Sequence, residues 1–344
     1  MEVWSGRSDV HWDTAQRALE DAGLGDGLPL VPPTKPRVDA ALHLAGIDGA
    51  TALAVLPPSY ESVTWRDVAI NAVMAGCAPD CLSIVAAAVE AIAAPEFNLL
   101  GIATTTGSAT VCIIVNGAIA RAVGMNSGSN AFGPGNRANA TIGRALRLTL
   151  QNCGGARAGE IDMATLGQPG KYSFCFAENA GETPWAPLHV ERGFAPEANV
   201  VTVAGVSGTI EVVDSESATP GDLAQTFAQS MLIAGNVGGA GLLGGGEPLI
   251  VMPPELADVF ARSGCTKAQA KAEIFERARL PIDRLATAQR ERASASGAAG
   301  DGSLRVALSA DDIMIVVAGG VGRKGAYVPT WSGTTKAVSR RVRG

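Results

Sequence analysis

Apolar positions along the chain fall into two kinds of run, long ones with helical spacing and short continuous ones. The long runs have apolar residues three and four positions apart, the spacing of one helix face. They predict helices at residues 12–22, 64–75, 79–93, 116–123, 136–151, 223–234, 254–262 and 266–279. Short continuous apolar runs are typical of strands covered on both faces. They predict strands at residues 98–103, 110–115, 248–252 and 313–320.

This alternation of helices and strands predicts an α/β fold. The stretches 113–127 and 250–264 share a strand–turn–helix–Gly layout, so we expect two related α/β lobes, buried strands flanked by helices, that arose by internal duplication. Ordinary alternation in any α/β protein explains the same layout. Glycine clusters at 238–246 and 319–325 flank predicted strands, and the second lies where open α/β sheets carry their sites.

The chain divides by composition into three predicted regions. Residues 1–60 form a helix and a Pro-rich arm, 61–195 a first α/β lobe, and 196–344 a second lobe with glycine-rich loops. Prolines at 29, 32, 33 and 36 argue against a helix or central strand there, so we expect the arm to cross the surface in an extended form. Residues 287–303 are rich in Ala, Ser and Gly and are expected to form a mobile loop.

Composition narrows the function classes. The 344 residues are 47% hydrophobic and 17% charged, with a net charge of −6. That balance predicts a large core and argues against nucleic-acid binding, which needs basic patches. Charges near the N-terminus interrupt any signal-peptide core, and the apolar run 81–94 is too short to span a bilayer. We therefore expect a cytoplasmic protein with no membrane partner that forms a homo-oligomer.

The six cysteines do not form the pattern of a disulfide framework in a chain of this size. Histidines number three, and no Cys-x2-Cys pair is present, so no metal site is predicted. The sequence indicates no particular cofactor.

A cysteine beside a predicted helix start is the first candidate for chemistry. Cys77 precedes Pro79, a residue favoured at the first helical position, and Asp80 then lies in the first turn. Unpaired N–H groups at a helix N-terminus lower a thiol pKa, so the pattern predicts a reactive thiolate at Cys77. Cys81, four residues on, is a candidate resolving thiol. The alternative is that both cysteines pack as small apolar residues between alanine-rich helices.

A polar, glycine-rich stretch at 127–144 opens another predicted helix. Arg137 and Arg144 are seven residues apart and share one helical face, and a helix N-terminus with arginines is suited to a carboxylate or phosphate. The residues predicted to hold an anionic substrate here are Asn136, Arg137, Asn139 and Arg144. An ordinary capped helix with a solvated face gives the same pattern.

Two further stretches supply polar candidates. The irregular stretch 152–172 contains Arg157, a second candidate for anion binding, with a plain surface charge as the alternative. Downstream, Glu178 and His189 lie among dense polar residues. Histidine transfers protons near neutral pH, so we predict a catalytic role for His189 and substrate binding for Glu178. The alternative is a structural histidine bonded to the backbone.

Three stretches together resemble one family. They are 68–77 (VAINAVMAGC), 133–145 (GPGNRANATIGRA) and 187–194 (PLHVERGF). They resemble bacterial proteins described as UGSC-type (seleno)proteins or thiol–disulfide oxidoreductase-like proteins, over residues 25–330. The Gly-Ser-Cys motif behind that label is absent here and belongs to a companion protein or domain of the family. The resemblance therefore implies such a partner.

The chain departs from the family pattern directly after the cysteine. The family has an Arg-Pro-Glu-Tyr run where this chain has Ala78-Pro79-Asp80-Cys81. That leaves Cys77 in place and puts a general role for Cys81 in doubt.

These patterns favour an enzyme that acts on a small anionic substrate by thiol-dependent redox chemistry at Cys77, with His189 transferring protons. One alternative is a lyase or addition enzyme on a small carboxylate or sulfur compound. Another is catalysis by Arg137 and His189 in which Cys77 only packs. A third is a non-catalytic subunit of a hetero-complex.

Overall fold

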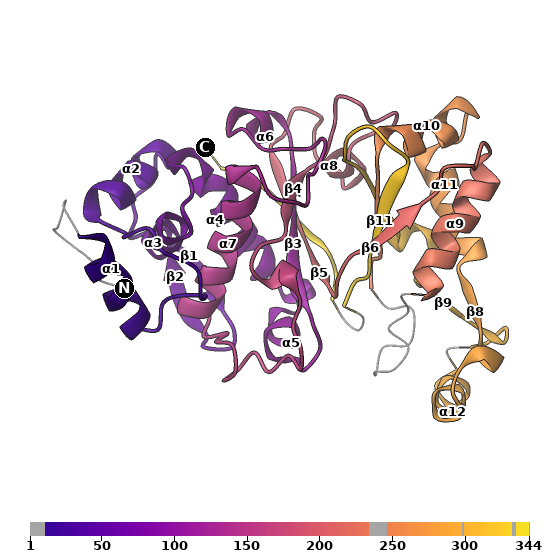
Figure 1. Cartoon of the computed structure of the whole chain (residues 1–344), viewed down its shortest axis with the longest axis horizontal. Helices are drawn as coiled ribbons and strands as arrows, with labels where there is room; N and C mark the ends of the chain where they lie inside the picture. Colours follow the sequence, from indigo (N-terminus) through magenta and orange to yellow (C-terminus); the bar gives the residue numbers. More distant parts are fainter. Residues whose placement is uncertain (1–10, 234–245, 298, 332–334, 344) are drawn as a thin grey trace.

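The computed structural model describes residues 11–233, 246–297, 299–331 and 335–343. The chain has an α/β fold in four layers, in which two mixed sheets pack face to face and helices cover the outer face of each sheet (Figure 1). None of the described helices combines the length and apolar character needed to cross a bilayer alone. The pair Pro79–Ile92 and Pro95–Thr104 reaches that length only across a 76° bend.

The first sheet and its helices come mainly from the N-terminal two thirds of the chain. The first sheet has the described order β12-β5-β3-β4, with β3 and β4 parallel and the other neighbours antiparallel. The elements up to β5 are α1 (Trp12–Asp21), α2 (Lys35–Ala45), β1 (Ala52–Leu56), β2 (Glu61–Thr64), α3 (Trp65–Ala75), α4 (Leu82–Ile92), α5 (Leu99–Thr104), β3 (Thr110–Asn116), α6 (Ala118–Ala122), α7 (Arg137–Asn152), β4 (Cys175–Ala177), α8 (Leu188–Glu191) and β5 (Val200–Val206).

The second sheet has the described order β10-β7-β11-β6, again with one parallel pair, β10 and β7, and antiparallel neighbours elsewhere. Its elements, and the strand that closes the chain, are β6 (Ile210–Val213), α9 (Pro220–Ile233), β7 (Leu249–Met252), α10 (Pro254–Arg262), α11 (Lys267–Arg277), β8 (Arg279–Pro281), α12 (Thr287–Ala295), β9 (Ser303–Arg305), β10 (Met314–Val317), β11 (Lys324–Val328) and β12 (Val338–Arg341).

The two sheets repeat one topology and exchange their last strands. In each sheet a central strand, β3 or β7, is followed in the chain by helices and then by a parallel strand, β4 or β10, on one side of it. The next strand of that sheet, β5 or β11, then pairs antiparallel with the other side of the central strand. β6 follows β5 in the chain but pairs with β11, and β12 follows β11 but pairs with β5. The chain crosses over where the Ser207 amide donates to the Pro329 carbonyl at 2.7 Å and the Trp331 amide donates to Gly205 at 2.9 Å. This repeat agrees with the layout expected of a duplication. The predicted boundary at residue 195 does not separate the sheets, because β5 and β12 complete the first one.

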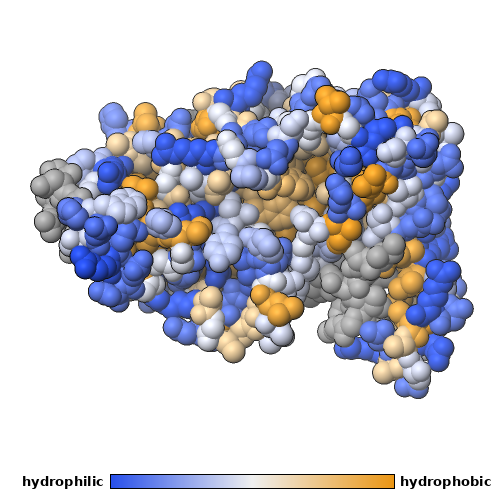
Figure 2. All heavy atoms as spheres, viewed as in Figure 1, coloured by the Kyte–Doolittle hydropathy of each residue, from blue (hydrophilic) through white to orange (hydrophobic). Residues whose placement is uncertain are grey.

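Alternating side chains of each strand enter different apolar layers, as the two-residue period of a strand requires. Cys112 and Ile114 of β3 face the second sheet, while Val111 and Ile113 face the helices. The second sheet contributes residues such as Val251 of β7 to the same apolar layer between the sheets. Figure 2 shows hydrophilic residues over both outer helical layers and apolar residues in the middle of the view, where the sheets lie.

Several predicted elements are present, and three predictions are wrong. The helix predicted at 64–75 is α3, which opens with a capping box in which Thr64 Oγ1 accepts from the Asp67 amide. The predicted strand at 98–103 is the helix α5, the Pro-rich arm contains the helix α2, and the expected loop at 287–303 contains the helix α12. The glycine cluster at 238–246 lies outside the described residues, apart from Gly246.

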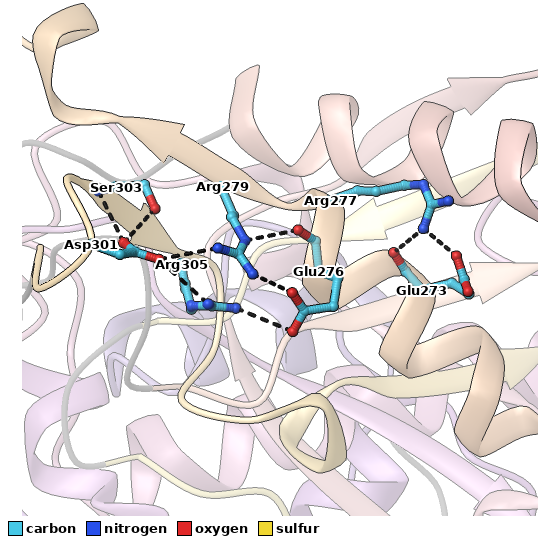
Figure 3. Close-up of polar contacts among 7 residues, drawn as sticks. All are labelled: Glu273, Glu276, Arg277, Arg279, Asp301, Ser303 and Arg305. Carbon is cyan, nitrogen blue, oxygen red and sulfur yellow. Dashed lines mark hydrogen bonds and ion pairs between the residues drawn. The ribbon is translucent and has the colours of Figure 1, made fainter.

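The segment from β8 to β9 protrudes from the second helical layer and carries α12 (Figure 1). A charge network joins it to α11 (Figure 3). Arg279 binds Glu276 and, at 3.1 Å, Asp301, while Arg305 lies 3.5 Å from Asp301 and 3.6 Å from Glu276. Hydrogen bonds from Ser303 lower the pKa of Asp301. The side chains are largely exposed, so the network fixes geometry more than it stabilises the fold.

Candidate functional site

The Pro-rich arm is bound to α7 by a buried ion pair. Arg144 Nε and Nη2 each lie 2.8 Å from an oxygen of Asp26, and Nη2 also donates to the carbonyls of Leu28 and Pro29 at 3.1 and 3.0 Å. Burial raises the pKa of the Asp26 carboxyl, but the Arg144 guanidinium outweighs it and holds that pKa below its usual value. The structure thus places Arg144, predicted to bind substrate, in the attachment of the arm.

A cavity of about 730 Å³ lies between this arm, the C-terminal half of α7 and the loop 157–172. We call it the arm cavity. Its volume is within the range of small-molecule sites. Among the predicted site residues, Arg157 lines it. Gln168, Lys171 and Tyr172 also line it and belong to the same candidate stretch, 152–172, whereas Arg147 and Gln151 of α7 line it and were not predicted as site residues.

The ion pairs around the arm cavity leave positive charge on its wall. Asp162 lies 3.3 Å from Arg147 Nη2 and 2.6 Å from Lys171 Nζ, so two cations share one carboxylate. Arg157 donates from Nη1 to the Gly23 carbonyl at 2.9 Å and has no carboxylate partner within the described residues. Asp26 also lines the cavity, but its charge is balanced by Arg144, and Glu160 contributes an opposing charge that is exposed. The buried part of the wall is therefore cationic.

The mouth of the arm cavity is apolar. Leu166 lines it and is 95% exposed, and Tyr172 lines it and is 53% exposed. Ile161 and Met163, on the same loop, are also exposed. Large apolar side chains that are this exposed in one loop are characteristic of a binding surface. The cavity can hold an acid group at its cationic wall and an apolar group at its mouth.

Cys77 lies between two helices, directly after the end of α3 and just before a helix start at Pro79, as the sequence predicted. α3 ends at Gly76, which has φ 88°, and the Cys77 amide donates to the Ala72 carbonyl at 3.0 Å. The residue therefore follows a helix C-terminus. It also precedes a helix start, because a short 3-10 turn, Pro79–Cys81, runs directly into α4 at Leu82.

A second cavity, of about 340 Å³, contains Cys77 on its wall together with Arg137 and Arg37. Its other walls are mainly apolar. Burial raises the pKa of the Cys77 thiol to about 12, against smaller lowering effects of Thr141 and Arg137. The predicted low pKa is therefore wrong, and the burial of the thiol away from water is the reason.

The raised pKa predicts slow alkylation of Cys77. At pH 7.5 a thiol with a pKa of about 12 is ionised in about one molecule in thirty thousand, and the thiolate is the reacting form. Cys265 is likewise partly exposed, and burial raises the pKa of its thiol less. We expect iodoacetamide to modify Cys265 first, Cys77 slowly and the fully buried Cys112 last, as measured by mass spectrometry of labelled peptides. Preferential labelling of Cys77 would contradict this.

The asparagines at the start of α7 hold the backbone. Asn136 caps the helix by accepting from the Asn139 amide at 2.9 Å. Asn139 is buried and donates to the Asn126 and Ala131 carbonyls at 2.8 and 3.1 Å. Arg137 donates from Nε to the Gly76 carbonyl at 2.9 Å while reaching the Cys77 cavity. Of the α7 residues predicted to bind substrate, Arg137 is the one that lines a cavity.

Glu178 lies buried beyond the ends of β3 and β4. Its Oε2 accepts from Asn116 Nδ2 at 2.6 Å and from the Leu188 amide at 2.8 Å, and its Oε1 has no hydrogen-bond partner among the residues that the structure describes. His189 is also buried, with Nε2 at 3.1 Å from the Pro196 carbonyl, and its Nδ1 has no partner in the same part of the chain. Both residues lie on the side of the second sheet, where α8 contacts β10, whereas Cys77 packs against the helical layer of the first. The structure does not bring His189 to Cys77.

Burial raises the pKa of Glu178, more than its Lys267 and Asn116 contacts lower it. A carboxyl that holds its proton more tightly when folded stabilises the fold at low pH, and that stability is lost as pH rises through the folded pKa. In Glu178→Gln the amide oxygen can accept the same two hydrogen bonds, and no carboxyl remains to ionise. We therefore expect the variant not to lose stability as pH rises through the folded pKa of Glu178. Urea unfolding from pH 4.5 to 8.5 tests it, and parallel pH profiles for variant and wild type would contradict it.

Sequence reasoning singled out the stretch 152–172, which lines much of the arm cavity, but missed the wall that α7 and the arm contribute. Arg144, Arg147 and Gln151 lie at i, i+3 and i+7 on α7, so their shared face was a readable signal. The spacing of Asp162 and Lys171 in the sequence does not predict their ion pair, because the pair depends on the path of an irregular loop. Within the described residues, no group of three or more His, Cys, Asp and Glu side chains is placed to hold a metal ion.

Comparison with known proteins gives no match for this chain among protein-family models, curated proteins or solved structures.

Proposed function

We propose that this chain binds a small organic anion in the arm cavity, as a cytoplasmic protein of small-molecule metabolism. The observation that carries the proposal is the Arg157 guanidinium, which lines the cavity and has no carboxylate partner within the described residues. An arginine fork matches a carboxylate or phosphate in two parallel hydrogen bonds. The expectation of a small anionic substrate is thus kept, at a site other than Cys77.

The remaining wall supports binding of the acid group. Arg147 and Lys171 share one carboxylate, Asp162, so their two positive charges are only partly balanced. An anionic oxygen of a ligand near them would therefore be attracted. Gln151 donates from Nε2 to the Gly25 carbonyl at 2.7 Å, which keeps the arm against the cavity. The polar groups are therefore held in place before a ligand arrives, and less ordering is required on binding.

The apolar mouth of the arm cavity favours a ligand with an apolar group beside its acid group. Leu166 and Tyr172 offer surface to an aliphatic or aromatic group attached to the acid. The proposed ligand is thus an amphipathic organic anion. The same exposed side chains suit a protein partner that closes the cavity, which is how the companion protein implied by the family resemblance would fit this proposal.

A thermal-shift panel tests the proposal. Phenylacetate and phenyl phosphate carry both required groups, phenylacetamide lacks the charge, and acetate and inorganic phosphate lack the apolar part. A ligand at 100 times its Kd stabilises a fold by about 2.7 kcal/mol. We expect the amphipathic anions to raise the unfolding temperature most and the neutral amide least. Equal shifts of the unfolding temperature for the amide and the anions would contradict the proposed role of Arg157 in binding the acid group.

Thiol chemistry at Cys77 is a second candidate function, favoured by the position of Cys77 and Arg137 on the wall of one cavity. The burial that raises the thiol pKa opposes it in the unliganded protein. Its test is thiol–disulfide exchange with oxidised glutathione, in which a Cys77 thiolate forms a mixed disulfide and releases glutathione. Exchange that is lost in Cys77→Ser, with the fold intact, would favour this function over simple binding.

A further inference from the structure

A separate cavity opens between the two sheets, on the inner face of β11 and β6. Its volume is about 340 Å³, at the lower end of the range for small-molecule sites. Val251, Ala318 and Ala326 form its floor and continue the apolar layer between the sheets. We call it the inter-sheet cavity. It shares no lining residue with the arm cavity.

Two opposite charges line the inter-sheet cavity from neighbouring strands. Glu211 of β6 pairs in register with Ala326 of β11, and Lys324 lies two residues before Ala326. Residues two apart on a strand share a face, so both charges lie on the face of Ala326. Diagonal neighbours of this kind are about 7–8 Å apart. Within the described residues, neither charge has an ion-pair partner.

An aromatic side chain forms another wall. Phe132 lines the cavity and is 40% exposed. Its ring packs edge-on against Phe174 and Phe176, with centroids 5.3 and 4.8 Å away. These contacts fix the ring, so the wall is rigid. The cavity thus combines an exposed cation, an exposed anion and an apolar wall and floor.

We propose that the inter-sheet cavity binds a small zwitterion, an α-amino acid with an apolar side chain. Its carboxylate pairs with Lys324, its ammonium group pairs with Glu211, and its side chain packs on Phe132. Each charge of the ligand then meets the opposite charge of the protein, whereas a ligand with one charge leaves a protein charge unpaired. Such unpaired partners are the strongest source of discrimination between similar ligands.

The simplest competing explanation assigns the charges to the sheet edge. β6 is an edge strand of the described sheet, and inward-pointing charges at an edge prevent pairing with another chain. That explanation predicts self-association when the charges are removed and no binding of amino acids. The two explanations therefore differ in a measurable way.

Titration calorimetry with L-phenylalanine and L-leucine tests the proposal on the full chain. L-phenylalaninamide removes the ligand carboxylate, and 3-phenylpropionate removes the ammonium group. We expect each analogue to bind the wild type at least tenfold more weakly than L-phenylalanine. Lys324→Gln is expected to abolish the discrimination against the amide, and Glu211→Gln the discrimination against 3-phenylpropionate.

Matched surface variants, Lys35→Gln and Glu61→Gln, control for the loss of a charge far from the cavity and are expected to bind as the wild type does. No binding of either amino acid, or self-association of the Glu211 and Lys324 variants without it, would overturn the proposal. Binding that survives both cavity variants and is lost in Arg157→Ala would place the amino acid in the arm cavity and overturn it as well.

Discussion

Replacing Arg144 with alanine is expected to lower the free energy of unfolding by about 3–5 kcal/mol, the cost of leaving a buried charge without its partner. The Asp26 side chain is 6% exposed and the Arg144 side chain 13% exposed, so water does not replace the lost contact. The arm carbonyls of Leu28 and Pro29 lose a donor in the same step. Chemical unfolding with urea measures the loss.

Two controls separate the buried pair from charge in general. Arg262→Ala removes an ion pair with Asp258 whose arginine is 82% exposed, and such pairs contribute less than about 1 kcal/mol. Asp26→Asn in the Arg144→Ala background removes the uncompensated charge, so it is expected to recover part of the loss. A cost for Arg144→Ala as small as that of Arg262→Ala would show that Arg144 is free for another role.

Replacing Arg157 with alanine is expected to weaken binding of an amphipathic anion about 10- to 100-fold with little change in stability. Hydrogen bonds to charged groups contribute about 1.5–3 kcal/mol, which sets that range. Arg157 is half-buried, and its guanidinium donates a hydrogen bond to the Gly23 carbonyl. The backbone hydrogen bonds of Arg157 remain in the variant, so the fold loses little. Titration of phenyl phosphate into wild type and variant measures the change in Kd.

Arg157→Lys is the informative companion variant. Lysine keeps the charge and loses the two-pronged geometry, so we expect affinity between that of wild type and Arg157→Ala. Arg290→Ala on α12, an exposed arginine far along the chain, controls for net charge and is expected to leave Kd unchanged. Equal losses in Arg157→Ala and Arg290→Ala would indicate a non-specific charge effect.

The local elements that the sequence predicted well are those with a cap or a long periodic run. Thr64 and Thr266 open helices with capping boxes, and β3 is buried on both faces as its continuous apolar run indicated. The run at 98–103 was misassigned because a short apolar run suits strand and helix alike. There the Asn98 side chain accepts from the Gly101 amide at 3.3 Å and starts a helix.

Two other errors came from composition. Pro36 lies in the first turn of α2, where the missing N–H is tolerated, so a nearby cluster of prolines did not exclude a helix. α12 is rich in Ala, Arg and Glu, which favour helices, although Ser and Gly in the same stretch suggested a loop. The exchange of β6 and β12 between sheets had no local signal, because strand partners are set by tertiary packing.

The candidate site was predictable in part. Arg157 was identified from an irregular, glycine-rich stretch, and the structure places it on a cavity wall. The thiol of Cys77 was misjudged because its environment depends on α2, α3 and α7 together, which no local pattern shows. The spacing of Arg144 on one face of α7 fits ligand binding and attachment of the arm equally well. Its actual role follows from its ion pair with Asp26, which lies 118 residues away in the sequence.

A crystal structure of the protein with its tightest-binding amphipathic anion shows directly whether the arm cavity is the binding site. Density for the acid group is expected within hydrogen-bond reach of the Arg157 guanidinium, with the apolar group at Leu166 and Tyr172. Density for the anion beside Cys77 and Arg137, with the arm cavity holding only solvent, would contradict it.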